Sequence, residues 1–162
     1  MQQTSKLTVT LPNDLEIVLT RSFDAPKHLV FEAFTKCEHY ARWWGLRDMT
    51  LAQCEMDFRV GGRWRRVLRM PDGSEHPFRG EFIEIVPTEK IVQTFVYDVE
   101  FIRDHPSIET MELTEEGGRT TLTATVRHKT KEARDGHLQS GMESGASESY
   151  DRLEELLAEL QG

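Results

Sequence analysis

The sequence predicts an α+β domain in which an antiparallel sheet packs against one long C-terminal helix. Two periodicities predict these elements. Apolar and small residues from Leu138 to Leu160 recur at spacings of three and four, which is the helical period. After Gly45, apolar and polar residues instead alternate for about eighty residues, which is typical of half-buried strands. Because a sheet with one apolar face must cover that face, we expect the final helix to lie across it.

The chain before this alternating region predicts one strand and two short helices. The alternation of apolar and polar residues in Leu15–Phe23 predicts the strand. The sequence Asp24-Ala25-Pro26 then has the features of a helix start, because an acidic residue is favourable there and proline lacks only an N–H that would be unpaired. A second short helix is predicted over Glu38–Trp44, and it ends at Gly45.

Turn signals rich in glycine and proline divide the alternating region into six further strands, which gives about seven strands in all. The predicted strands are Met49–Arg59, Arg63–Met70, His76–Val86, Ile91–Tyr97, Ile108–Thr114 and Thr120–His128. Consecutive hairpins predict an antiparallel meander. The predicted order is therefore one strand, two short helices, six strands and a long helix.

Composition bounds the class of protein. The chain has 162 residues, and we expect a flexible arm at 1–13 before a single domain at 14–162. A net charge of −8 argues against nucleic-acid binding, and no run approaches the roughly 18 apolar residues of a membrane-spanning helix. Cys37 and Cys54 lack metal-ligand spacing, so we expect two free thiols, a cytoplasmic location, no metal and no cofactor.

The predicted long helix changes character along its length. Its C-terminal half presents leucines, which fill a core, whereas its N-terminal half presents mostly small residues, with Gly141 at the edge. This change predicts a ligand cavity beneath Gly141–Ser149 and a sealed core beneath Leu153–Leu160. An equally supported interpretation is that Gly141 and Gly145 allow the helix backbone to pack tightly against a strand.

Arginines are concentrated between Asp57 and Arg79. Most of them occupy alternate strand positions, where they are typical of a solvated face with acidic partners, although an anion-binding or partner-binding face fits the same pattern. Arg66 differs because it shares its face with Trp64 and Leu68. A buried guanidinium requires a partner, so Arg66 indicates a salt bridge, a local bulge or an anionic ligand.

The candidate binding site is the set of side chains expected to line the cavity. It comprises Trp43, Trp44, Trp64, Arg66, His76, Phe78, Phe82, Phe95, Met111, Leu122, Leu138, Met142, Gly145 and Ser149. Several have a purely structural alternative. Trp43 and Trp44 are typical of core residues as well as of a pocket floor, and His76 is typical of a rim residue as well as of a ligand anchor. Phe95, Met111 and Leu122 are sheet-side walls or plain core.

No catalytic residue is predicted. The sequence Gly141-Met-Glu-Ser-Gly145 is not a G-x-S-x-G nucleophile motif and lies in a helical pattern, and no H-E-x-x-H sequence is present. An acid/base pair assembled in space from Arg21, His76, Glu84 or Arg66 stays an open alternative.

Six short motifs in order resemble the family named for the activator of the heat-shock protein 90 ATPase, within the START-like (SRPBCC) helix-grip superfamily. They are Arg21-Ser-Phe-Asp-Ala-Pro26; Val30-Phe31-Glu-Ala33-Phe34-Thr35; Ala41-Arg-Trp-Trp-Gly45; Asp57-Phe-Arg-Val-Gly-Gly-Arg-Trp64; Pro71-Asp-Gly73; and Gly141-Met-Glu-Ser-Gly145 before Tyr150-Asp-Arg-Leu153. The resemblance covers Leu15 to Leu160. It implies a helix-grip fold, with a curved antiparallel sheet wrapped around the final helix.

The resemblance also implies three functional hypotheses. The first is a domain that binds a hydrophobic or amphipathic small molecule between sheet and helix. The second is a metal-free enzyme, similar to the cyclases or hydrolases of the same fold, that uses this cavity. The third is a chaperone-associated interaction module that uses the arginine-rich face. A homodimer is a further expectation, because the edge strands of an open sheet need covering.

Overall fold

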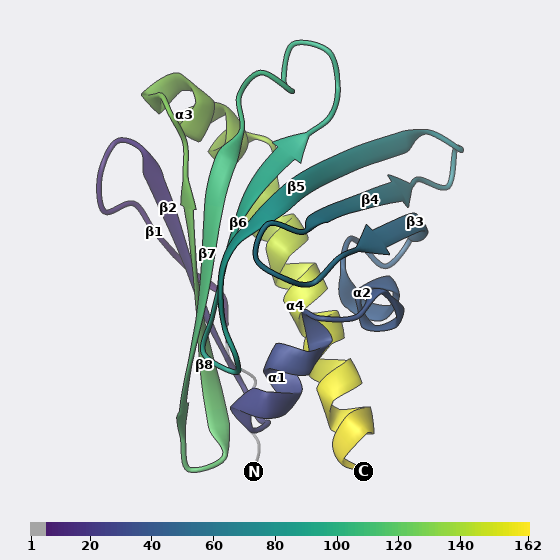
Figure 1. Cartoon of the computed structure of the whole chain (residues 1–162), viewed down its shortest axis with the longest axis vertical. Coiled ribbons are helices and arrows are strands. Elements are labelled where there is room, and N and C mark those ends of the chain that lie inside the picture. The colour runs from purple at the N-terminus through teal and green to yellow at the C-terminus, as the bar shows by residue number, and fades with distance from the viewer. Residues whose placement is uncertain (1–5) are drawn as a thin grey trace.

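The computed structural model describes residues 6–162 and is an α+β structure in which one curved sheet surrounds a long C-terminal helix (Figure 1). The strands are β1 (Thr8–Thr10), β2 (Glu16–Phe23), β3 (Thr50–Met56), β4 (Arg63–Arg69), β5 (Glu75–Val86), β6 (Lys90–Tyr97), β7 (Ser107–Glu116) and β8 (Arg119–Arg127). The helices are α1 (Lys27–Ala33), α2 (Cys37–Trp43), α3 (Lys131–Gln139) and α4 (Met142–Gln161). The predicted fold class is confirmed.

All pairs of neighbouring strands are antiparallel, in the order β1-β2-β8-β7-β6-β5-β4-β3. The meander from β3 to β8 is as predicted, and the first predicted strand, β2, closes it by pairing with β8. The additional strand is β1, which pairs with β2 and so raises the count to eight. The predicted flexible arm at 1–13 therefore contains an edge strand, while residues 1–5 lie outside the described part of the chain.

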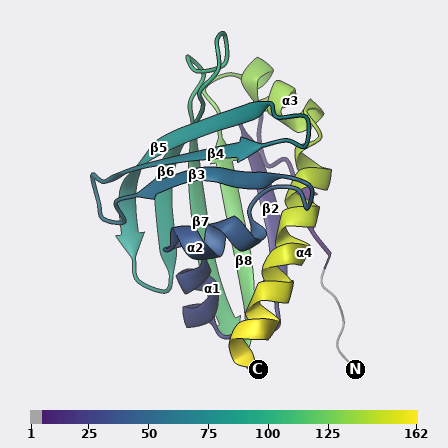
Figure 2. The ribbon, with the colours of Figure 1, turned by 90° about the vertical axis from the view of Figure 1, so that its right-hand side faces the viewer.

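Helices α1, α2 and α4 lie on the concave side of the sheet (Figure 2). Pro26 is the N-cap of α1, as the sequence predicts, and α2 ends at Trp43. Helix α4 packs against α1, α2 and α3, and it runs diagonally across the sheet (Figure 2). Two connecting contacts fix it: Ser149 Oγ accepts from the Gly45 backbone N–H and donates to the Gly45 carbonyl oxygen, both at 3.0 Å.

The prediction of one continuous helix from Leu138 to Leu160 is wrong. Helix α3 ends at Gln139, and α4 begins at Met142 after Gly141, which adopts a left-handed conformation with φ of 86°. Only glycine populates that region freely, so Gly141 interrupts the helix. Leu138 therefore lies in α3. The helical period misled because Leu138 and Met142 both pack against the core, so that the apolar spacing continues across the break.

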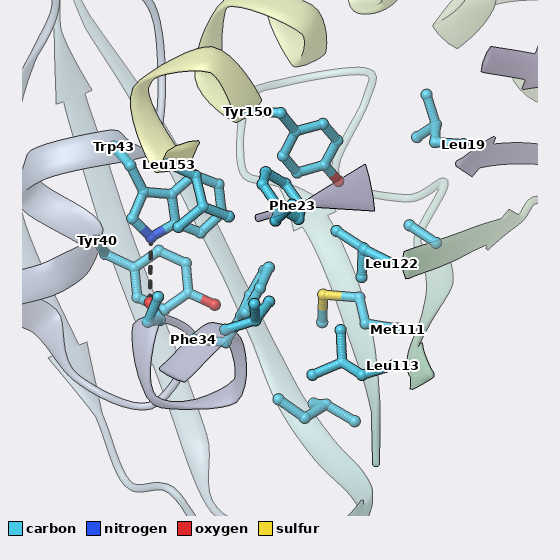
Figure 3. Close-up of a cluster of buried hydrophobic side chains, with 14 of the residues drawn as sticks. Leu19, Phe23, Phe34, Tyr40, Trp43, Met111, Leu113, Leu122, Tyr150 and Leu153 are labelled. Atoms are coloured by element: carbon cyan, nitrogen blue, oxygen red, sulfur yellow. Dashed lines mark hydrogen bonds between the residues drawn. The ribbon is translucent and has the colours of Figure 1, made fainter. Parts of the chain in front are cut away.

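The core lies between the sheet and the C-terminal half of α4 (Figure 3). Leu153, Leu156 and Leu157 are buried there, which agrees with the predicted leucine-filled core. The prediction that the sealed core extends to Leu160 is wrong, since 39% of the surface of Leu160 is exposed. It is the penultimate residue of α4, beyond the buried leucines.

The expectation of two free thiols is also wrong, because Cys37 and Cys54 form a disulfide with a Cα–Cα distance of 5.8 Å. The bond connects the first turn of α2 to β3. Sequence spacing gave no sign of it, because 17 residues separate the two cysteines and only the packing of α2 beside β3 brings them together. The thiols consequently give no support to a cytoplasmic location. Among the described residues, no helix is both long and apolar enough to cross a membrane.

Candidate functional site

The candidate site is centred on Arg66, whose side chain points to the concave side of the sheet from β4. Strand alternation buries Trp64, Arg66 and Leu68, while Arg65 and Arg69 face solvent, as the sequence predicts. The guanidinium carbon of Arg66 lies 3.8 Å from the ring centre of Tyr40 and 4.1 Å from that of Trp64. Cation–π attraction of this kind is strongest where the cation is desolvated, so the rings hold Arg66 in place.

Neither a bulge in β4 nor a salt bridge explains the burial of Arg66. The register of β4 against β5 is regular through Arg66. The irregularity in the pairing with β3 lies in β3, between Leu51 and Gln53, opposite Leu68 and Val67, and Arg66 itself pairs regularly with Cys54. Within residues 6–162 no carboxylate lies within salt-bridge distance of Arg66, and its Nε and Nη2 atoms have no hydrogen-bond partner. Burial lowers the pKa of Arg66, although an arginine at neutral pH stays charged.

A polar pair opposite Arg66 was missed by the sequence analysis. Gln93 on β6 donates from Nε2 to Oε1 of Glu109 on β7, at 2.9 Å. Glu109 keeps some accessible surface, yet protein surrounds its carboxyl closely enough for burial to raise its pKa against the opposing effects of Gln93 and Arg66. A signal existed, because Glu109 shares strand parity with the inward Met111, as Gln93 does with Ile91.

We expect replacing Glu109 with glutamine to stabilise the protein increasingly as the pH rises. The folded-state pKa of Glu109 is raised, so folded protein keeps this proton to higher pH than the unfolded chain. The stability that the group contributes is full below its ordinary pKa of 4.5 and is lost as the pH rises toward the folded-state pKa. Urea unfolding at pH 5 and pH 8 measures the difference. Glu112→Gln, at an exposed position of the same strand, is the control, and an equal gain at both pH values would contradict the prediction.

An aromatic wall continues from Arg66 along β5 and β6. Phe78 stacks on Tyr97 with ring centres 4.9 Å apart, and it also contacts Phe95 at 5.4 Å and Trp44, the residue after α2, at 5.2 Å. His76 Nδ1 lies 2.5 Å from the Tyr97 hydroxyl oxygen at the end of this wall. All five side chains are only half-buried, although four of them belong to the inward face of the sheet and Trp44 directly follows α2.

Three of the other predicted site residues form the core at the opposite end. Phe82, Met111 and Leu122 are buried and belong to the main hydrophobic cluster. Trp43 is buried as well, with its indole nitrogen donating to the Ala33 carbonyl oxygen at 3.1 Å (Figure 3). Trp43, Met111 and Leu122 correspond to the core interpretation weighed for them. Phe82, which was expected to line the cavity, is part of the core, whereas Trp44 turns toward Phe78.

The first two turns of α4 form the helix side of the site. They are less deeply buried than the C-terminal half of α4. Met142, Gly145 and Ala146 are half-buried in the first two turns of α4. A Cβ atom added to Gly145 would meet no atom within 4 Å, so this glycine does not serve a close approach to a strand. Gly80 on β5 does serve a close approach, because a Cβ there would lie 2.0 Å from the Thr94 carbonyl oxygen.

Two of the four residues in the open acid/base alternative are paired elsewhere. Arg21 is buried and donates from Nη1 to Asp151 of α4 at 2.9 Å. Glu84 follows an irregularity in the pairing of β5 with β6, faces solvent and pairs with Lys90 at 3.3 Å. Glu84 and Arg66 therefore do not share a site. No group of three potential metal ligands is present among the described residues.

The outer arginines form ion pairs with acidic neighbours. Arg59 pairs with Asp57 at 2.8 Å, Arg69 with Glu75 at 2.8 Å, and Arg79 with Asp98 at 3.3 Å. The interpretation of this face as solvated arginines with acidic partners is confirmed for these three pairs.

Two hollows lie outside the predicted site. One of about 730 Å³ is lined by Asn13, Asp14, Leu15, Arg127 and Lys131. The other, of about 380 Å³, is lined by Leu15, Thr94, Pro106, Ser107, Ile108, Arg127, His128 and Lys129. Neither contains a residue of the predicted lining.

A curved antiparallel sheet wrapped around a long C-terminal helix, with two short helices after the first long strand, defines the helix-grip fold of the SRPBCC class. The chain belongs to the family described as Activator of Hsp90 ATPase homolog 1-like protein, whose model matches residues 24–158. The family resemblance seen in the sequence motifs is thereby confirmed. No curated protein matches the sequence.

Solved structures agree with this assignment. Protein NE0264 from Nitrosomonas europaea is 25% identical with a TM-score of 0.83, over 93% of this chain and 99% of that one. A protein from Rhodobacter sphaeroides is 24% identical with a TM-score of 0.87, over 96% and 99% of the two chains. The AHSA1 protein from Silicibacter pomeroyi is 22% identical with a TM-score of 0.74, over 91% and 99%. The last two show the fold alone.

Proposed function

We propose that the protein binds a hydrophobic or amphipathic small molecule between the sheet and the first turns of α4. One observation carries the proposal: a group of inward-facing apolar side chains at this end is only half-buried, although Trp64 and Arg66 beside it are buried, whereas the apolar side chains at the other end are buried. On β5 the contrast is between Phe78 and Phe82, and on α4 it is between Met142 and Leu153. Apolar groups facing the interior of a closed core would be excluded from solvent, so their residual accessibility supports a ligand site.

The polar groups of this end support the same function. Ligand sites are mostly apolar, with a few polar groups that fix orientation. Here the aromatic wall supplies the apolar surface, and Arg66, Gln93 and Glu109 supply the polar groups. The Oε1 atom of Gln93 and two nitrogens of Arg66 have no partner within residues 6–162.

Replacing Gly145 with leucine should abolish binding while leaving the fold intact. A leucine at this half-buried position extends into unoccupied space beside the first turns of α4, so it occupies volume that a ligand would need. The measurement is titration with prodan, a neutral naphthalene probe whose fluorescence reports an apolar environment, and we expect affinity to fall at least about tenfold. The matched control is Gly136→Leu in α3, where an added Cβ also meets no atom within 4 Å. Unchanged prodan affinity in the Gly145 variant would contradict the proposed position of the site.

Two further expectations from the sequence stay predictions. A cytoplasmic location lacks the support of free thiols, and a homodimer through the edge strands β1 and β3 has no contact in this structure to test it. Native mass spectrometry of protein purified from its own cells measures oligomeric state and retained ligand together.

A further inference from the structure

Arg66 presents two N–H groups whose acceptors are missing from the protein. The side chain is 1% exposed, and its Nε and Nη2 atoms have no hydrogen-bond partner within the described chain. These two atoms lie on the same edge of the planar guanidinium, so their N–H bonds run side by side. Leaving such groups unpaired in a buried site is costly, and an ionised acceptor would satisfy both at once.

Aromatic side chains surround the Arg66 guanidinium. Tyr40, Trp64 and Trp44 contact the guanidinium through their rings, at 3.8, 4.1 and 5.0 Å from the guanidinium carbon. The rings themselves offer no acceptor that lies in the guanidinium plane. The Tyr40 hydroxyl does interact with Arg66 through a side-chain hydrogen bond, yet Nε and Nη2 still have no partner within the described chain. Two parallel N–H donors in that plane match the two oxygens of a carboxylate.

The charge of the site favours one negative charge over two. Among the described residues, Arg66 is the cation of this aromatic cluster, and Glu109 stands close enough for their charges to interact. A monocarboxylate would be neutralised by Arg66 alone. A phosphate dianion would leave a charge uncompensated in a buried site that also contains an acidic side chain, which is unfavourable.

We infer that the natural ligand is an amphipathic monocarboxylate whose carboxylate accepts from Nε and Nη2 of Arg66. Its apolar body lies against the half-buried Phe78, Phe95 and Trp44. This assignment rests on the proposed binding function and adds the chemical class of the ligand. It gives the buried guanidinium the ion partner that the protein itself lacks.

The experiment compares naphthalene-1-acetate with naphthalene-1-acetamide, which have the same ring and differ in charge. Affinities are measured by calorimetry for the wild type, Arg66→Met, Arg66→Gln and the control Arg65→Met, with circular dichroism confirming each fold. Arg65 is the exposed neighbour on the same strand. Hydrogen bonds to a charged group predict that the wild type binds the acid roughly tenfold to a hundredfold more tightly than the amide. Both Arg66 variants should bring that ratio close to one, and Arg65→Met should keep it.

Each alternative result has a distinct meaning. Equal binding of acid and amide by the wild type would overturn the carboxylate assignment while leaving a small-molecule site in place. A preference for the acid that survives in both Arg66 variants would overturn the role of Arg66. If neither compound binds and prodan also fails to bind, the proposed function itself fails, and the ligand class fails with it.

Discussion

Replacing Trp43 with alanine is expected to lower the free energy of unfolding by about 3–5 kcal/mol. The side chain is 2% exposed and lies between the rings of Tyr40 and Tyr150, with ring centres 5.3 and 6.2 Å away. Truncation therefore leaves a cavity where α2 meets α4, and it also removes the hydrogen bond to Ala33. Equilibrium urea unfolding measures the loss.

Trp44→Ala is the matched control for this prediction. Trp44 is the next residue in the chain but is only half-buried, and its ring faces Phe78 rather than the core. We expect a clearly smaller loss of stability there. A loss below about 1 kcal/mol for Trp43→Ala would be too small for a buried aromatic side chain and would contradict its place in the core.

Replacing Gly80 with alanine is the second change with a large expected effect, about 3 kcal/mol or more of lost stability. The added Cβ would lie 2.0 Å from the Thr94 carbonyl oxygen and 2.6 Å from the Trp64 indole. The first contact is with backbone in the neighbouring strand, and the second is with a buried ring, so neither yields easily. Because Trp64 stacks on Arg66, the candidate site should be disturbed as well.

Gly136→Ala tests whether the position, rather than the loss of a glycine, causes this effect. The residue lies inside α3, and an added Cβ meets no atom within 4 Å. Alanine has the higher helix propensity, so we expect a gain of up to about 1 kcal/mol. Thermal unfolding of both variants gives the comparison. Similar losses in the two variants would argue against the close approach of β5 and β6 at Gly80.

Elements with a strong local period could be predicted from the sequence, and elements determined by tertiary contacts could not. Strand β4 is the clearest success, because its alternation places Arg66 inward and Arg65 outward. The break at Gly141 is invisible to a periodicity argument, since apolar residues continue at helical spacing on both sides of it. The disulfide between Cys37 and Cys54 depends on how α2 packs beside β3, which no local pattern encodes.

For the same reason, only part of the candidate site could be predicted from the sequence. Arg66 was found because it interrupts an apolar face, and Glu109 interrupts the inward face of β7 in the same way. The predicted strand begins at Ile108, only one residue before Glu109, so the alternation on that side is too short to assign Glu109 a face. Whether Arg66 and Glu109 form a salt bridge depends on tertiary structure, because β5 and β6 lie between β4 and β7 in the sheet.

The most direct test of the central claim is to locate a bound molecule by amide chemical-shift changes on adding naphthalene-1-acetate to ¹⁵N-labelled protein. Binding between the sheet and α4 predicts that the largest changes occur at Phe78, Phe95, Glu109 and the first turns of α4. Residues of the buried end, such as Leu156, should change little. Changes confined to the outer face of the sheet, or to the hollow lined by Asn13 and Lys131, would contradict the account.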